Sequence, residues 1–125
     1  MARIRTLKPS FWASPTVSQI SRDARLLAAG LVSFADDDGR FVAGISGING
    51  YVFPNDDLPN VKVAKWLAEV QASGFAHLYD VDGGRYGCLP TWHLHQVINR
   101  YTPSKFPPPT DVECAPRKKA SNADD

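Results

Sequence analysis

Residues 61–89, VKVAKWLAEVQASGFAHLYDVDGGRYGCL, decide the fold that the sequence predicts. Within this stretch, residues 75–81 and 85–89 alternate apolar with other side chains on either side of Asp82-Gly83-Gly84. Two alternating runs joined by a short Gly-rich turn are typical of a β-hairpin. The run before the hairpin has helical spacing and ends at Gly74, and glycine is the usual residue just beyond a helix C-terminus. The sequence therefore predicts a helix followed by a β-hairpin.

The helix predicted over residues 61–73 has two different faces. Its apolar side chains gather on one side at about 100° per residue: Val63, Ala64, Leu67, Ala68 and Val70. The opposite side is expected to be exposed and holds Lys62, Lys65, Trp66, Glu69 and Ser73. Because an exposed tryptophan beside two lysines is unusual for a face that only meets water, this face is a candidate contact surface.

Local patterns towards the N-terminus predict the rest of the domain. Ser21 is a suitable N-cap for an amphipathic helix that runs to Ala35. Residues 36–39, Asp-Asp-Asp-Gly, are expected to end that helix as a solvated turn, since they lack the spacing of a calcium loop. A short edge strand at 41–42 and a short helix at 44–53, weakened by three glycines, come next.

A helix, a strand, two helices and a hairpin, in this order, are the elements of a winged helix-turn-helix. The expected fold class is therefore α+β, a winged helix-turn-helix with three helices and a β-hairpin wing. We expect a basic and aromatic arm at residues 1–20, the winged-helix domain at 21–106, and a Pro-rich, polar, disordered tail at 107–125.

The composition indicates one small globular domain. The chain has 125 residues, with 43% hydrophobic and 22% charged side chains and a formal net charge of +1, and it contains no apolar run long enough to cross a membrane. Residues 1–25 hold five basic side chains against one acid, 36–57 hold five acids against one base, and 85–106 hold three bases and no acid. This uneven distribution predicts a positive face.

The cysteines and the N-terminus predict a cytoplasmic protein. Cys88 lies in an apolar run and Cys114 in a polar tail, so we expect no disulfide and a reducing compartment. No signal-peptide h-region follows the basic N-terminal residues.

Several short motifs, in their order along the chain, resemble the winged-helix N-terminal domains of phage replication initiators, also called replisome organisers, and related helix-turn-helix proteins of actinobacterial phages and prophages. The motifs are ARIRTLKPSFW at 2–12, ARLL at 24–27 leading to DDDGR at 36–40, VFP at 52–54 with DD at 56–57, WHLHQ at 92–96 and PSKFP at 103–107. This resemblance implies a protein of the bacterial host cell that binds double-stranded DNA without catalysis, in phage replication or gene regulation.

The sequence departs from the family pattern in two ways, and both bear on the expected role. The third helix has only Lys62 and Lys65 as basic residues, and the sequence ends at Asp125 without the second region that replication initiators usually have. A stand-alone regulator or accessory protein is therefore expected as much as an initiator.

The candidate DNA-binding residues come from the arm, the third helix, the wing and the segment after it: Arg3, Arg5, Lys8, Lys62, Lys65, Trp66, Arg85 and Lys105. In the arm, Phe11 and Trp12 are expected to anchor the chain and leave the arginines free to reach a groove or the phosphates. The alternatives are a solvated Arg85 and a Trp66 that packs against the arm or a second copy of the chain.

Neither a metal site nor an enzyme is expected. His93 and His95, with Cys88 nearby, give a weak metal signal without a fourth ligand. The same histidines are better suited to local hydrogen bonds or phosphate contacts. No Ser/His/Asp or Cys/His set falls on adjoining elements, so we expect no cofactor and no catalysis.

The leading hypothesis is therefore a DNA-binding protein, plausible as a homodimer on duplex sites. The alternative is a winged-helix interaction module that binds a host or replisome protein, since a fold does not dictate a function. An outward Trp66 favours this alternative, because exposed aromatics often anchor interfaces. An acidic segment 36–57 lying beside the third helix would disfavour DNA binding.

Overall fold

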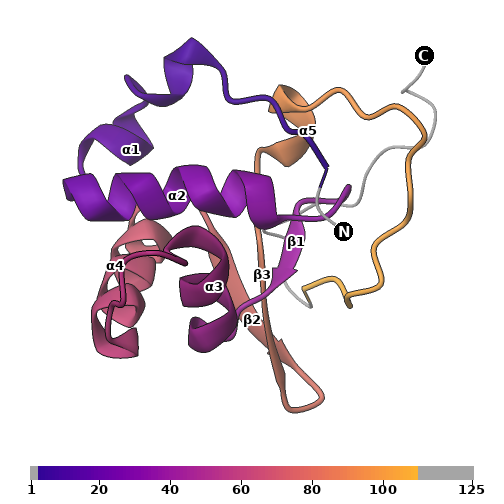
Figure 1. Ribbon diagram of the computed structural model, residues 1–125. Helices are drawn as coiled ribbons and strands as arrows, with labels where there is room; N and C mark the ends of the chain where they lie inside the picture. The colour runs from indigo at the N-terminus through magenta and orange to yellow at the C-terminus, as the bar shows by residue number, and fades with distance from the viewer. Residues whose placement is uncertain (1–2, 110–125) are drawn as a thin grey trace.

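A computed structural model describes residues 3–109 as an α+β fold with a small antiparallel sheet (Figure 1). Its elements, in chain order, are η1 (Pro9–Phe11), α1 (Pro15–Ser18), α2 (Arg22–Phe34), β1 (Arg40–Val42), α3 (Ile45–Val52), α4 (Asn60–Ser73), β2 (His77–Val81), β3 (Gly84–Cys88) and α5 (Trp92–His95). None of these helices combines the length and apolarity that crossing a bilayer requires.

Helix α2 is the central element. The Ser21 hydroxyl caps it by accepting a hydrogen bond from the Ala24 N–H, as predicted. Both Ser21 donors in turn bind the Glu69 carboxylate of α4, the N–H at 2.9 Å and the hydroxyl at 3.0 Å. One face of α2 is fully buried, through Ala24, Leu27, Ala28, Leu31 and Val32. This face packs on α3 and α4 and closes the main core.

The predicted hairpin forms and joins the predicted edge strand. The strand order is β1-β3-β2, and both pairings are antiparallel. Phe41 of β1 lies opposite Gly87 of β3, and a Cβ at Gly87 would overlap the Phe41 ring. Glycine is therefore required where the strand crosses the buried ring.

The arrangement of the helices is compatible with a winged helix. Helices α3 and α4 lie on one side of α2, η1 and α1 lie on the other, and the tip of the β2–β3 hairpin projects on the side of α3 and α4 (Figure 1). Helix α4 ends at Gly74, whose φ of 90° is the left-handed C-terminal conformation that glycine allows.

The prediction of a solvated turn at residues 36–39 is wrong. Asp37 is only 4% exposed. Its carboxylate pairs with Arg5 at 2.9 Å and with Arg3 at 3.1 Å, and it accepts the Thr102 N–H at 2.9 Å. The turn is buried because the N-terminal arm and the chain after α5 both bind to it, which no local pattern could reveal.

The other two aspartates of this turn hold the chain after α5. Asp38 accepts hydrogen bonds from the Tyr101 hydroxyl and the Ser104 N–H. Asp36 accepts one from the Ser104 hydroxyl. The three consecutive carboxylates therefore connect both ends of the described chain to the end of α2.

The segment that follows returns along the sheet, on the face turned away from the main core. The Tyr79 hydroxyl donates to the Pro107 carbonyl at 2.8 Å, and Arg40 donates to the Phe106 carbonyl at 3.1 Å. Pro109 is buried. Pro107 and Pro109, at the start of the predicted tail, thus contact the domain, whereas Pro108 is exposed. The rest of the predicted tail, 110–125, lies outside the described residues.

Cys88 lies on this same face and is disulfide-bonded, so the prediction that the cysteines stay unpaired is wrong. The other cysteine of the sequence, Cys114, lies outside the described residues. The cysteines therefore no longer support a reducing compartment, and a cytoplasmic location stays a prediction.

We expect Asp37→Asn to lower the free energy of unfolding by about 2–3 kcal/mol. The substitution keeps the size of the side chain but leaves the Arg5 guanidinium, whose side chain is 6% exposed, without its counter-ion. Urea unfolding followed by circular dichroism measures the change. The matched control is Asp56→Asn in the exposed loop before α4, where we expect a change within about 0.5 kcal/mol. Equal effects of the two variants would contradict this account of the turn.

The same carboxylate predicts a loss of stability in acid. Burial alone would raise the pKa of Asp37, but the Thr102 N–H and the Arg5 and Arg3 guanidinium groups outweigh it and hold the pKa below its ordinary value of 3.8. The stabilisation is therefore complete above that value and is lost as the pH falls through the lower pKa of the folded state. The difference between the unfolding midpoints of wild type and Asp37→Asn should therefore shrink as the pH is lowered below 3.8. A difference that does not shrink as the pH falls would contradict this assignment.

Candidate nucleic-acid interface

The two lysines of α4 lie on its exposed face, as predicted. Lys62 and Lys65 are exposed, and within residues 3–109 their ammonium groups form no ion pair or hydrogen bond. Val61, one position earlier, is 74% exposed. The opposite face of the helix is buried through Val63, Leu67 and Val70. Helix α4 thus presents two unpaired cations and one apolar side chain to an incoming partner.

The prediction that Trp66 points outward is wrong. Its ring packs against the main core and meets the Phe53 ring at a centroid distance of 5.5 Å. Phe53 itself is buried at the end of α3. Trp66 follows Lys65 around the helix towards α3, so the neighbouring helix covers a position that the helical wheel alone left exposed.

The wing contributes one cation. Arg85 is exposed near the hairpin turn and, among the described residues, forms no ion pair. It lies opposite Asp80 on the neighbouring strand, and Asp82 stands in the turn with a φ of 50°. Because alternate residues of a strand share a face, Arg85 lies on the same face as Gly87, which faces the core. The positive charge of the wing is therefore partly balanced by two neighbouring carboxylates.

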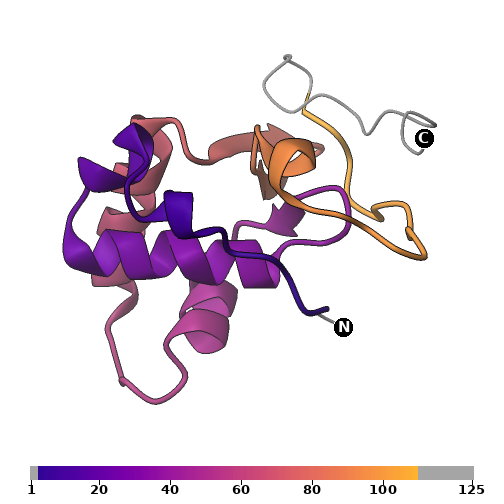
Figure 2. The same ribbon diagram turned by 90° about the horizontal axis from the view of Figure 1, so that it is seen from above.

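The arm does not leave its arginines free, so that expectation is wrong. Arg5 is buried between Asp37 and the ring of Trp92, 5.1 Å from the ring centroid, and it donates to the Ala35 carbonyl. Arg3 pairs with Asp37 and donates to the carbonyls of Asn99 and Arg100. Figure 2 shows the arm lying along α2. A buried carboxylate at the end of α2 holds these arginines inward. Of the two expected aromatic anchors, Phe11 is buried, whereas Trp12 is 51% exposed.

Lys8 and Lys105 are exposed but belong to other surfaces. The Lys8 ammonium donates to the Leu94 carbonyl of α5 at 3.2 Å. Lys105 lies between Ser104 and Phe106, in the segment that packs on the sheet face turned away from the main core. The structure therefore does not gather the eight predicted DNA-binding residues into one surface, since the arm and residue 105 lie apart from α4.

Acidic side chains flank the start of α4. Asp56 and Asp57 are exposed in the loop that leads directly into Asn60. The other acidic residues of the predicted segment, Asp36 to Asp38, lie at the end of α2 and bind the arm and the chain after α5. Two of the five acidic residues of this segment thus lie beside the third helix, which limits the positive potential of this face.

Within residues 3–109, no group of three or more His, Cys, Asp or Glu side chains is placed to hold a metal ion. His93 and His95 are exposed in the last turn of α5. Trp92 of the same helix closes the core, as expected, and donates its indole N–H to the Asp37 carbonyl. The sequence reasoning missed Asp37 itself. Its one signal was a run of aspartates following a helix in a chain with an arginine-rich N-terminus.

The position of Trp66 predicts a difference between two neighbouring residues of α4. We expect Trp66→Ala to lower the free energy of unfolding by about 2 kcal/mol, because it opens a cavity against Phe53. Lys65→Ala, on the exposed face, should change it by less than about 0.5 kcal/mol. Thermal and urea unfolding of both variants measure this. A Trp66→Ala variant as stable as wild type would place the ring outside the core.

The chain was compared with known proteins in three ways. No protein-family model, no curated protein and no solved structure matches this chain.

Proposed function

We propose that this protein binds duplex DNA without catalysis, as a winged helix-turn-helix protein in phage replication or gene regulation. Helix α4 enters the major groove, and the turn of the β2–β3 hairpin lies against the phosphate backbone. The resemblance of the sequence to phage replication initiators provides the biological setting.

The observation that carries the proposal is the pair of unpaired lysines on α4. Lys62 and Lys65 lie one turn apart on the exposed face of the helix, and no carboxylate of the described residues pairs with them. The one acid near them on α4, Glu69, is bound to Ser21. An exposed pair of cations on one helix face suits contacts to phosphates that flank a groove.

The order of the elements supports the same proposal. Helices α3 and α4 precede the hairpin, the strands pair in the order β1-β3-β2, and the hairpin tip projects on the side of α3 and α4 (Figure 1). In a winged helix this places the third helix and the wing side by side on DNA. Arg85 then becomes the phosphate contact of the wing.

Fewer residues are proposed as DNA contacts than the sequence alone suggests. Arg5 is buried in an ion pair and Arg3 is bound by four acceptors, so we assign them to folding. Trp66 likewise packs inside. The proposed contacts are Lys62, Lys65 and Arg85. With three cations, binding is weak, and specificity comes mainly from the polar and apolar groups of α4, among them Asn60 and Val61.

Fluorescence anisotropy with a labelled random-sequence duplex, titrated across salt concentration, tests the proposal. We expect the logarithm of the binding constant to fall linearly with the logarithm of salt, with a slope of about −3 for three phosphate contacts. The double variant Lys62→Ala, Lys65→Ala should flatten that slope to about −1. The control Lys8→Met removes a cation near α5, away from α4, and should leave the slope unchanged.

Absence of binding at about 20 mM salt, where phosphate contacts are strongest, would refute DNA binding. The function would then be the alternative, an interaction module that binds a host or replisome protein through α4. The 74% exposure of Val61 and the flanking carboxylates of Asp56 and Asp57 favour that alternative. A Val61→Asp variant that loses a partner while keeping its fold would then locate the interface.

A further inference from the structure

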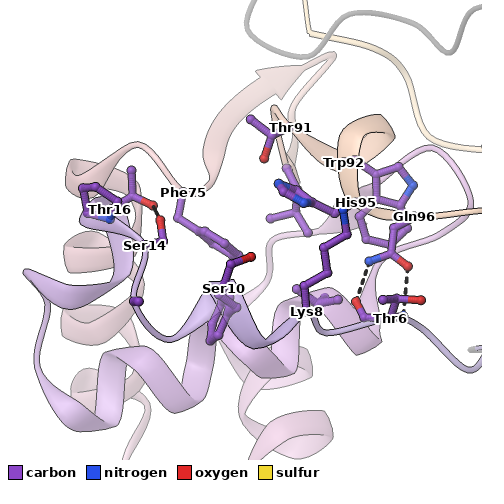
Figure 3. A pocket seen from close by; sticks show the side chains of 15 residues that line it. Thr6, Lys8, Ser10, Ser14, Thr16, Phe75, Thr91, Trp92, His95 and Gln96 are labelled. Atoms are coloured by element: carbon purple, nitrogen blue, oxygen red, sulfur yellow. Dashed lines mark hydrogen bonds between the residues drawn. The ribbon is translucent and has the colours of Figure 1, made fainter.

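A pocket lies on the side of the molecule opposite α3 and α4, between the N-terminal arm, η1, α1 and α5 (Figure 3). Its volume is about 430 Å³, within the range of roughly 300–1,000 Å³ that small-ligand sites occupy. None of the proposed DNA contacts lines it. The pocket is therefore a second candidate site, independent of the proposed DNA binding.

The inner part of the pocket is aromatic. Phe11 of η1 and Phe75, just after α4, meet edge to face at a centroid distance of 5.5 Å. Trp92 of α5 closes another side. Rings arranged in this way offer a dry surface to an apolar or aromatic group of about the size of a phenyl ring.

One side of the pocket is polar and basic. Lys8 and His95 lie together on that side, across from Phe75 (Figure 3). The Lys8 ammonium uses one N–H on the Leu94 carbonyl, which leaves two further donors. The His95 side chain is exposed and takes part in no hydrogen bond with the rest of the described chain.

The charge around the pocket favours an anion. No aspartate or glutamate is among the residues that line it, so Lys8 meets no carboxylate of the pocket itself. Thr6 and Gln96 are already paired with each other, through the Thr6 N–H and the Gln96 amide oxygen and through the Gln96 amide N–H and the Thr6 carbonyl (Figure 3). Lys8 and His95 are the basic groups available to a ligand, beside the hydroxyls of Ser10 and Thr91, and both can donate to a carboxylate.

We propose that this pocket binds a ligand in which an apolar group stands next to a carboxylate. The apolar group packs against Phe11, Phe75 and Trp92, and the carboxylate accepts hydrogen bonds from Lys8 and His95. Two sources supply this chemistry: a free aryl or alkyl carboxylate, or the C-terminal residue of another polypeptide.

Two acids and their amides test the ligand chemistry and separate its sources. The free molecules are 3-phenylpropionate and 3-phenylpropanamide; the peptides are N-acetyl-Ala-Ala-Phe and its C-terminal amide. Titration into the full ¹⁵N-labelled chain, followed by amide chemical shifts, gives site and affinity together. We expect saturable shifts around Phe11, Phe75 and His95, and each acid to bind at least about tenfold more tightly than its amide.

Matched variants locate the carboxylate contact. Lys8→Met keeps the length of the side chain and should bring the affinity for each acid closer to that of its amide, with no effect on the amide. The control Lys105→Met, in the segment on the sheet, should leave both affinities unchanged. Within α5, His95→Ala should weaken binding of the acid, whereas His93→Ala, which does not line the pocket, should not.

Each outcome decides the proposal. Tighter binding of the peptide acid identifies a polypeptide C-terminus as the ligand, and tighter binding of 3-phenylpropionate identifies a small carboxylate; both support the pocket. Equal affinity of acid and amide overturns the carboxylate contact, as does an unchanged affinity of Lys8→Met for the acids. Shifts confined to α4, or no saturable shift with any of the four probes, overturn the site.

Discussion

A buried carboxylate, that of Asp37, is the constraint on which much of this structure depends. A charge at 4% exposure is costly unless it is paired, and Asp37 meets that requirement only by recruiting distant parts of the chain. Arg3 and Arg5 approach from the N-terminal arm, and the Thr102 N–H approaches from the segment after α5. Both ends of the described chain are therefore held in place because the Asp37 carboxylate, in the turn at the end of α2, needs partners.

This constraint redistributes the positive charge of the protein. The N-terminal segment is the most basic part of the sequence, yet Arg5 is buried and Arg3 is engaged by Asp37 and by acceptors after α5. Of the predicted DNA contacts, those that remain for a partner on the side of α3 and α4 are Lys62, Lys65 and Arg85. Counting charges along the chain suggests a strongly positive face. The folded protein has a less positive one, because the buried Asp37 carboxylate binds the arginines of the basic N-terminal segment.

Elements set by local interactions were predictable from the sequence. The helix after Ser21, the turn at Gly74 and the β-hairpin follow from caps, glycine conformations and alternation, all of which act over a few residues. The site was less predictable. Trp66 and Arg5 both appeared exposed by position, and both are covered by parts of the chain that are remote in sequence. The bonding of Cys88 also escaped prediction.

The same long-range contacts that withdraw the arm from the surface also create the pocket. Thr6 is held to Gln96, and Lys8 to the Leu94 carbonyl, so the arm forms one wall and α5 the other. An arm extended into solvent would leave Phe11 and Trp92 on an open surface, where water would compete for the same apolar contact. Helix α2 separates η1 and α1 from α3 and α4 (Figure 1). The inward arm therefore withholds its arginines from the side of α3 and α4, where we propose that DNA binds, and supplies the opposite side with a lysine beside aromatic rings. The α4 face and the pocket thus differ in chemistry for one physical reason: the ion pairs with Asp37 hold the N-terminal arm on the side of the pocket.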